Sequence, residues 1–234
     1  MFATVLLRLL DAAHLDELAF VERLDAEERE AVGTPGRWSA RDHIAHVAYW
    51  RQRLADRLEA ELRGQPLPEL ESWETLNDKL FEERRRRSWP DVLADAERSH
   101  IALAACIERL NDEDLVTFGR FSWVDGQPLH DAVMGSAYEH LQLHLAQYHI
   151  ERGNLPEARH IHERSAARVV DADTPPALEG LVLYNLACFH SLHGDLHDAR
   201  VALDRALALY PTSRLAEFAR TDPDLIPLRD GGGH

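Results

Sequence analysis

Apolar residues recur every three to four positions along almost the whole chain, which is the spacing of an amphipathic helix. The first such segment covers residues 3 to 24, and a second follows a Gly- and Pro-containing break at residues 33 to 36. Ser39 and Asp42 have the spacing of a capping box, so the second helix is predicted to begin there and to reach about Leu62.

Three more helices are predicted over residues 72 to 87, over 88 to 110 and over roughly 130 to 152. The segment VTFGRFSWVDGQPLH between the last two carries a turn signal at Asp125-Gly126, and it could form a small hairpin or an ordered loop. Long helices joined in this way predict an all-α protein whose residues 1 to 152 form an up-and-down four-helix bundle.

The remaining residues contain an internal repeat. GNLPEARHIHERSAARVV, from residue 153, aligns without gaps with GDLHDARVALDRALALYP, from residue 194. The second copy and the helix before it resemble a tetratricopeptide repeat (TPR), with small residues at Ala187, Ala199 and Ala206 where two helices must approach closely. Residues 153 to 230 are therefore predicted to form a TPR-like helical hairpin.

The helix predicted over residues 130 to 152 is apolar on two sides. One stripe consists of Val133, Ala137, Leu141, Leu145 and Tyr148, and a second consists of Leu143, Ala146 and Ile150. A helix that is apolar on two sides is usually packed on both, so we expect the C-terminal unit to dock on the bundle. The alternative is that Leu143 and Ile150 meet a second subunit in a homodimer.

Composition narrows the range of partners. The chain of 234 residues has a formal net charge of −15 and no basic stripe with interleaved aromatic residues, which argues against binding to nucleic acid or to an anionic membrane. The four arginines at 84 to 87 are interpreted as the solvated end of a helix rather than as a phosphate site. Cys106 and Cys188 lie in apolar runs and imply no disulfide framework, and no signal peptide or membrane span is evident, so a cytoplasmic protein is expected.

Histidines provide the candidate chemistry. His140 and His144 are one helical turn apart, a spacing that lets two imidazoles reach one ion. His46, at the edge of the second helix's apolar stripe, is the candidate third ligand, and His43 is the reserve choice. The alternative is that these are partly buried histidines satisfied by neighbouring side chains. Trp50 and Trp123 could line a cleft near His46, although tryptophans in a bundle more often serve packing.

Three stretches resemble the DinB superfamily of four-helix bundles, and within it most closely the ClbS/DfsB branch: WSARDHIAHVAYW, LFEERRRRSWPDVLADAERSHIALAACIERLNDEDL and GQPLHDAVMGSAYEHLQLH. The resemblance covers most of residues 1 to 152. It implies a metal site with one histidine from the second helix and two from the last bundle helix, which here are His46, His140 and His144. Zinc, nickel and iron(II) all accept three imidazoles, so the sequence does not choose among them.

Two functions remain open at this point. The first is a metal-dependent hydrolase or small-molecule transferase, with a role in detoxification or self-protection implied by the resemblance, in which Glu139 or His43 acts as general base. The second is a non-catalytic scaffold with a dimerising bundle and a TPR-like unit that binds a protein. Convergence of the three histidines would favour the enzyme, and a groove over residues 177 to 210 would favour the scaffold.

Overall fold

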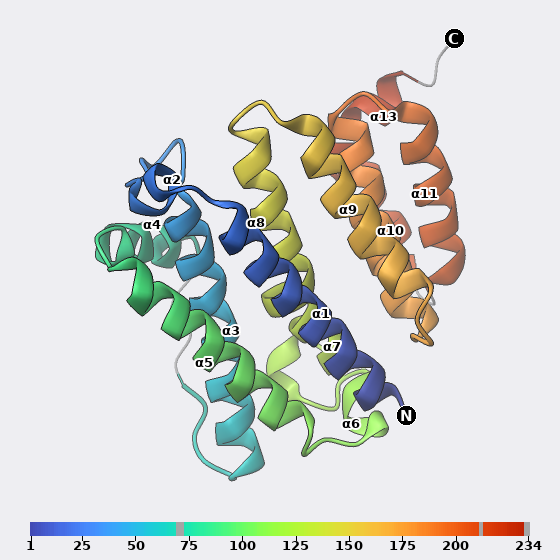
Figure 1. The fold of residues 1–234 in the computed structure, drawn as a ribbon. Coiled ribbons are helices and arrows are strands. Elements are labelled where there is room, and N and C mark those ends of the chain that lie inside the picture. Colours follow the sequence, from blue (N-terminus) through green and yellow to red (C-terminus); the bar gives the residue numbers. More distant parts are fainter. Residues whose placement is uncertain (69–72, 211–212, 232–234) are drawn as a thin grey trace. The chain divides into compact units, whose positions relative to one another are not determined.

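The computed structural model describes residues 1–68, 73–210 and 213–231. Within these residues the secondary structure is helical and contains no β-strand, which confirms the predicted all-α class (Figure 1). The chain divides into two compact units, Ala3–Ala158 and Arg159–His234, and helix α9 crosses from one to the other. Each unit is described by itself.

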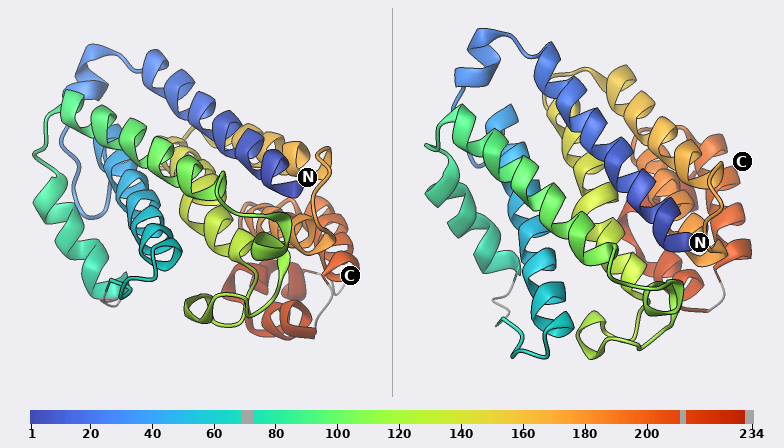
Figure 2. Two further views of the ribbon diagram at one scale, coloured as in Figure 1. Left: turned by 90° about the horizontal axis from the view of Figure 1, so that it is seen from below. Right: turned by 60° about the horizontal axis from the view of Figure 1, so that its bottom comes forward.

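The first unit consists of long and short helices (Figures 1 and 2). The helices are α1 (Phe2–Arg23), α2 (Ala26–Glu30), α3 (Ala40–Leu62), α4 (Trp73–Arg84), α5 (Trp89–Ile107), α6 (Asp112–Val116), α7 (Leu129–Val133) and α8 (Glu139–Ile150), followed by the start of α9 (Leu155–Val170). The long helices agree with the hydrophobic pattern, whereas the short helices α2 and α6 were not predicted. Each of these two spans only five residues, too few for helical periodicity to be recognised.

Polar contacts link α1 to two other long helices. Arg51 of α3 donates from Nη2 to both carboxylate oxygens of Glu17 at 3.1 Å, and both residues are almost completely buried. Gln142 of α8 donates from Nε2 to Asp16 Oδ2 at 2.9 Å. These contacts fix α1 against the pair of helices that carry the candidate histidines.

The start of α3 is a capping box, as predicted. The Asp42 carboxylate accepts a hydrogen bond from the Ser39 N–H at 2.8 Å, and the Ser39 hydroxyl accepts one from the Asp42 N–H at 3.3 Å. A Cβ on Gly33 would collide with Oδ2 of Asp42 and lie 2.5 Å from the Ser39 nitrogen, so only glycine allows the preceding loop to pass this close. The cap thereby fixes the positions of the first turns of α3.

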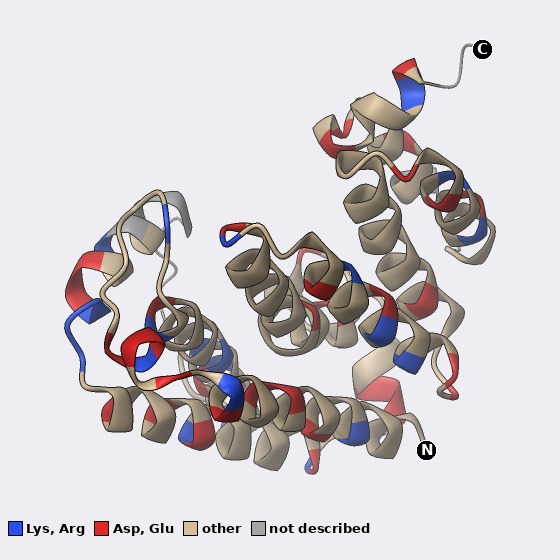
Figure 3. Ribbon diagram, turned by 45° about the horizontal axis from the view of Figure 1, so that its top comes forward, with Lys and Arg blue, Asp and Glu red and all other residues tan. Residues whose placement is uncertain are grey.

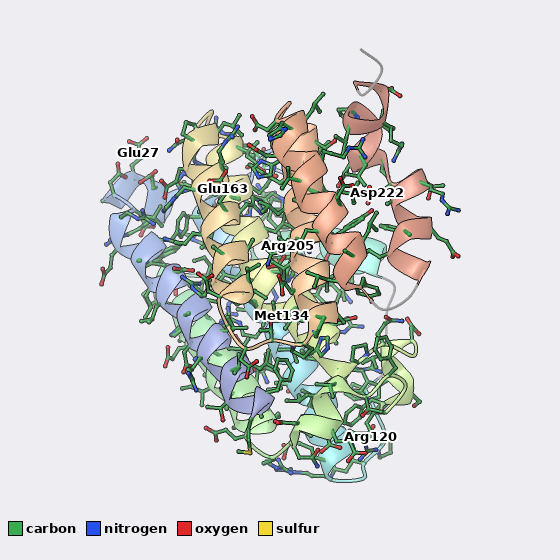
Figure 4. The ribbon with its side chains drawn as sticks, turned by 90° about the vertical axis from the view of Figure 1, so that its right-hand side faces the viewer. Glu27, Arg120, Met134, Glu163, Arg205 and Asp222 are labelled. Carbon is green, nitrogen blue, oxygen red and sulfur yellow. The ribbon has the colours of Figure 1, made fainter. Side chains whose placement is uncertain are left out.

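The helix predicted over residues 130 to 152 is interrupted by a π turn. Residues Met134–Tyr138 form this turn between α7 and α8, and Met134, labelled in Figure 4, is fully buried. The segment before it, residues 117 to 128, forms turns and the 3₁₀ helix Ser122–Val124, so the ordered-loop alternative is correct and the hairpin is wrong. π turns inside α-helices are frequent at functional sites.

The second unit contains the rest of α9 and the helices α10 (Pro176–Leu192), α11 (Leu196–Leu209), α12 (Ser213–Thr221) and α13 (Ile226–Asp230), with the 3₁₀ helix Pro223–Leu225. Helices α10 and α11 pack closely, because a Cβ on Gly180 would lie only 3.1 Å from the carbonyl oxygen of Ala206. Asp222, labelled in Figure 4, accepts a 2.7 Å hydrogen bond from the Tyr184 hydroxyl and so joins the segment after α12 to α10.

Acidic and basic residues are interspersed along the helices (Figure 3). Among the described residues, no helix is both long and apolar enough to cross a lipid bilayer. Cys106 and Cys188 are both free and buried, as the apolar runs around them indicated. Burial raises the pKa of both thiols, which keeps them protonated and unreactive at neutral pH.

Candidate metal centre

Three histidines from two helices meet in the first unit. His46 projects from α3, and His140 and His144 project from consecutive turns of α8. The Nε2 atom of His140 lies 3.2 Å from Nε2 of His46 and 3.1 Å from Nε2 of His144. One ring nitrogen of each residue lies within 4.8 Å of the other two. The structure thus brings together the three residues that the sequence singled out as metal ligands.

Hydrogen bonding among the histidines alone does not satisfy this arrangement. Each imidazole nitrogen carries either one hydrogen or one lone pair, so Nε2 of His140 can complete only one of its two short contacts. A cation between the rings would instead accept a lone pair from all three. Ligand atoms about 2.1 Å from a metal, at angles of about 90° to 110°, stand about 3.0 to 3.4 Å apart, which agrees with the spacings around His140.

Burial keeps these imidazoles neutral. The side chain of His46 is only 7% exposed, and burial, reinforced by the neighbouring His140 and His43, lowers its pKa to about 3. Burial also lowers the pKa of His140 to about 4, although an interaction with the backbone of Ser136 opposes the shift. The pKa of His144 is lowered well below its usual value for the same reason. Neutral imidazole is the form that binds a metal, so at neutral pH the three rings are in the form that a metal ion would require.

His43 lies behind His144 rather than inside the cluster. Its Nδ1 atom is 2.9 Å from Nδ1 of His144, and its Nε2 atom is 3.9 Å from Oε2 of Glu151. Glu151 also accepts hydrogen bonds from the Trp38 backbone N–H at 3.0 Å and from the Gln147 side chain at 3.1 Å. Burial raises the pKa of Glu151, but the interactions with His43, Gln147 and the Trp38 backbone outweigh it, so the pKa is lowered and the carboxylate stays ionised. A carboxylate behind a histidine is a common arrangement around metal-bound imidazoles.

Trp38 covers the cluster. Its indole ring stacks on the His144 ring, with 5.7 Å between ring centres, and lies edge-on to the His46 ring at 5.1 Å. The Phe81 ring of α4 also stacks on the Trp38 ring, with 5.7 Å between ring centres. A recess of about 10 Å³ beside His46 is lined by both aromatic rings, and it has room for about one water molecule. Trp38 was not among the residues predicted from the sequence to form the site. Its place directly before the Ser39 cap, one turn ahead of His43, was the only available signal.

The other candidates lie outside this cluster. Glu139 precedes His140 on α8, so its side chain leaves the helix about 100° around the axis, and its carboxylate is not among the converging ligand atoms. Trp50 lies near His46, with 6.2 Å between ring centres, and donates from Nε1 to Asn77 at 3.3 Å. Trp123 donates from Nε1 to Glu61 near the other end of α3 and does not lie beside the histidines.

Comparison with known proteins gives one match. The sequence profile of the DinB superfamily matches residues 9–148, which is more than half of the chain and includes all three histidines. No curated protein matches the chain, and no solved structure does.

Proposed function

The chain belongs to the DinB superfamily, and from this premise and the convergence of three imidazoles we propose that it is a metal-dependent enzyme that acts on a small molecule. His46, His140 and His144 hold one divalent transition metal ion, which is zinc, nickel or iron(II). The observation that carries the proposal is the double contact of His140 Nε2, which a shared cation satisfies and hydrogen bonds do not.

The reaction proposed is hydrolysis or transfer of a group between small molecules. When bound, the ion lowers the pKa of a water or thiol that occupies an open position beside the three histidines, and so supplies a nucleophile near neutral pH. Three protein ligands with an open position are typical of catalytic rather than structural sites. Trp38 and Phe81 line the recess beside His46 and would limit the access of bulk water to the histidines.

The two candidate bases now differ in their surroundings. Both ring nitrogens of His43 face other residues, His144 on one side and Glu151 on the other, so we assign it the role of positioning His144. Glu139 remains the proposed general base on the ground that it adjoins His140 in the sequence, although its side chain leaves the helix about 100° around the axis from that residue.

Several finer assignments rest on the sequence alone and are proposed with the same function. They are membership of the ClbS/DfsB branch, with a role in detoxification or self-protection, an up-and-down arrangement of the long helices, a TPR-like unit after residue 152 that binds a protein or supports the bundle, a homodimer, and a cytoplasmic location. The close packing of α10 on α11 at Gly180 supports the TPR-like interpretation. The converged histidines favour the enzyme over the non-catalytic scaffold.

Elemental analysis of untagged protein tests the metal. We expect about one equivalent of a transition metal in the wild type and its loss in His140→Ala and in His144→Ala, because each substitution removes a ligand. His149→Ala is the matched control, since this residue lies on the same helix and outside the cluster. If the protein binds no metal after incubation with zinc, nickel and iron(II), the proposal is wrong and the scaffold function becomes the better one.

A further inference from the structure

A second cavity in the first unit is lined by arginines. It has a volume of about 510 Å³, within the range of small-molecule sites, and lies between α3, the end of α4 and α5. Its charged lining consists of five arginines and two aspartates: Arg53, Arg57, Arg84, Arg87, Arg98, Asp56 and Asp95. Among the described residues the cavity therefore carries a formal excess of three positive charges, in a chain whose net charge is −15.

The two aspartates do not neutralise this charge. Asp95 of α5 is shared by three cations, because it pairs with Arg87 and with Arg98 and lies 4.0 Å from Arg84. Asp56 accepts a hydrogen bond at 2.8 Å from Gln52, a neutral partner. One carboxylate among three guanidinium groups leaves a local positive excess that an anion can complement.

Aromatic rings hold Arg57 and Arg84 in place without cancelling their charge. The guanidinium carbon of Arg57 lies 4.9 Å above the Trp123 ring, and that of Arg84 lies 4.9 Å above the Tyr49 ring. The buried Nε atoms of both arginines have no hydrogen-bond partner within the described part of the chain. Burial and the nearby Arg53 lower the pKa of Arg57, and burial and the nearby Arg87 lower that of Arg84. Like charges therefore crowd one another here, and a bound anion would relieve the repulsion.

We propose that this cavity binds a small organic molecule that carries at least two phosphate or carboxylate groups. The arginine run at 84 to 87 was interpreted from sequence as a solvated helix end, but Arg84 and Arg87 line the cavity together with residues from two other helices. Planar guanidinium groups bind both kinds of anion through paired N–H donors. The size of the cavity suits a metabolite rather than a polymer.

The cavity lies next to the candidate metal centre. Two of its lining residues on α3, Arg53 and Arg57, follow His46 along nearly the same face of the helix, and Arg53 is seven residues, or about 10 Å, further along the axis. Arg84 borders both the cavity and the recess beside His46. The two hollows therefore share Arg84 as a lining residue, and binding of a polyanion in the cavity does not depend on a metal.

Calorimetric titration of the full chain with pyrophosphate and with citrate tests the proposal, and glycerol serves as the uncharged control. Saturable binding of at least one polyanion that weakens as salt is added is expected, and the stronger of the two identifies the anionic group. The double variant Arg53→Gln/Arg98→Gln should bind at least about tenfold more weakly, because two charged hydrogen-bond donors are lost. Arg63→Gln/Arg109→Gln is the matched control, since it removes two arginines that pair with Glu59 outside the cavity.

Two further variants test whether anion binding depends on the charge of the cavity and whether it depends on the metal site. Asp95→Asn keeps every arginine and removes the shared carboxylate, so it should tighten binding. His140→Ala should leave binding unchanged, because the anion is held by arginines. No saturable binding, equal losses in the two double variants, weaker binding in Asp95→Asn, or loss of binding in His140→Ala would each overturn the proposal. The His140→Ala result also keeps a failure of the metal hypothesis distinct from a failure of this one.

Discussion

Nδ1 of His43 lies 2.9 Å from Nδ1 of His144, on the opposite side of the His144 ring from the nitrogen that meets His140. If Nε2 of His144 gives its lone pair to a metal, its Nδ1 carries the hydrogen and donates to His43. The remaining hydrogen of His43 then points from Nε2 toward Glu151. One carboxylate thereby fixes the tautomer of two imidazoles in sequence.

The first prediction concerns this support. His43→Ala should weaken metal binding by about 10- to 100-fold while leaving one equivalent bound at saturation, because the ligands remain and only their orientation is lost. His43→Gln should lose less, because its amide oxygen can still accept the hydrogen of His144. Competition with a chromogenic chelator measures the affinities, and His149→Ala is the control. An unchanged affinity in His43→Ala would show that His43 does not position His144.

The second prediction concerns pH and the stability of the metal-free protein. The pKa values of His46 and His140 are lowered to about 3 and about 4, against about 6.5 in an unfolded chain. The unfolded state therefore binds more protons as pH falls below 6.5, and the stability that the neutral histidines contribute above 6.5 is lost progressively. Between pH 6.5 and pH 5 the free energy of unfolding should fall by about 1.6 kcal/mol for each of the two residues.

The comparison that isolates these two groups uses the variant His46→Gln/His140→Gln, whose side chains do not titrate. Residues with shifted pKa values away from the cluster, such as His14, contribute equally to both proteins and cancel in the difference. All five tryptophans precede residue 124, so urea unfolding followed by tryptophan fluorescence reports on the first unit. Equal pH slopes in the two proteins would contradict the prediction.

The third prediction concerns the aromatic cover. Trp38→Ala should accelerate removal of bound metal by a chelator by about tenfold, because the ring that stacks on His144 shields the cluster from solvent. Trp38→Phe keeps an aromatic ring and should change the rate much less. Trp123→Ala, which removes a ring that does not lie beside the histidines, is the control. An extraction rate in Trp38→Ala equal to that of the control would show that the ring is no barrier.

Much of the site could be predicted from the sequence because helical geometry makes it nearly local. His140 and His144 share a face through their four-residue spacing alone, and a capping box fixed where the helix of His46 begins. Helical periodicity could not predict that α3 and α8 bring their histidines together. That step came from the resemblance to a superfamily, and the structure places the three rings together.

The features that were missed depend on contacts between distant segments. Trp38 precedes its helix, so no helical face predicts that its ring turns back onto His144. The π turn at Met134–Tyr138 could not be predicted from the hydrophobic pattern, because Val133, Ala137 and Leu141 keep the four-residue spacing of an uninterrupted helix. The arginine cavity joins residues from three helices, and each arginine alone has the pattern of a solvated helix surface.

The last prediction concerns the ion pair between Glu17 and Arg51, which is buried on both sides. Burial raises the pKa of Glu17, but Arg51 and His14 outweigh it and lower the pKa, so the carboxylate is charged when the protein is folded. Glu17→Gln leaves the Arg51 cation buried without a compensating charge, and should lower the free energy of unfolding by about 3 to 5 kcal/mol.

Replacing both partners separates the cost of an unpaired charge from the value of the pair itself. Glu17→Leu/Arg51→Met removes both charges and fills similar space, so it should restore most of the stability lost in Glu17→Gln. Glu97→Gln is the control, because its carboxylate is 54% exposed where it meets His14, and its loss should cost less than about 1 kcal/mol. Urea unfolding at pH 7 measures all three variants. If Glu17→Gln is as stable as Glu97→Gln, the uncompensated charge of Arg51 has no measurable cost. If the double variant is less stable than Glu17→Gln, the pair stabilises the α1–α3 contact by more than charge compensation. Either result contradicts the prediction.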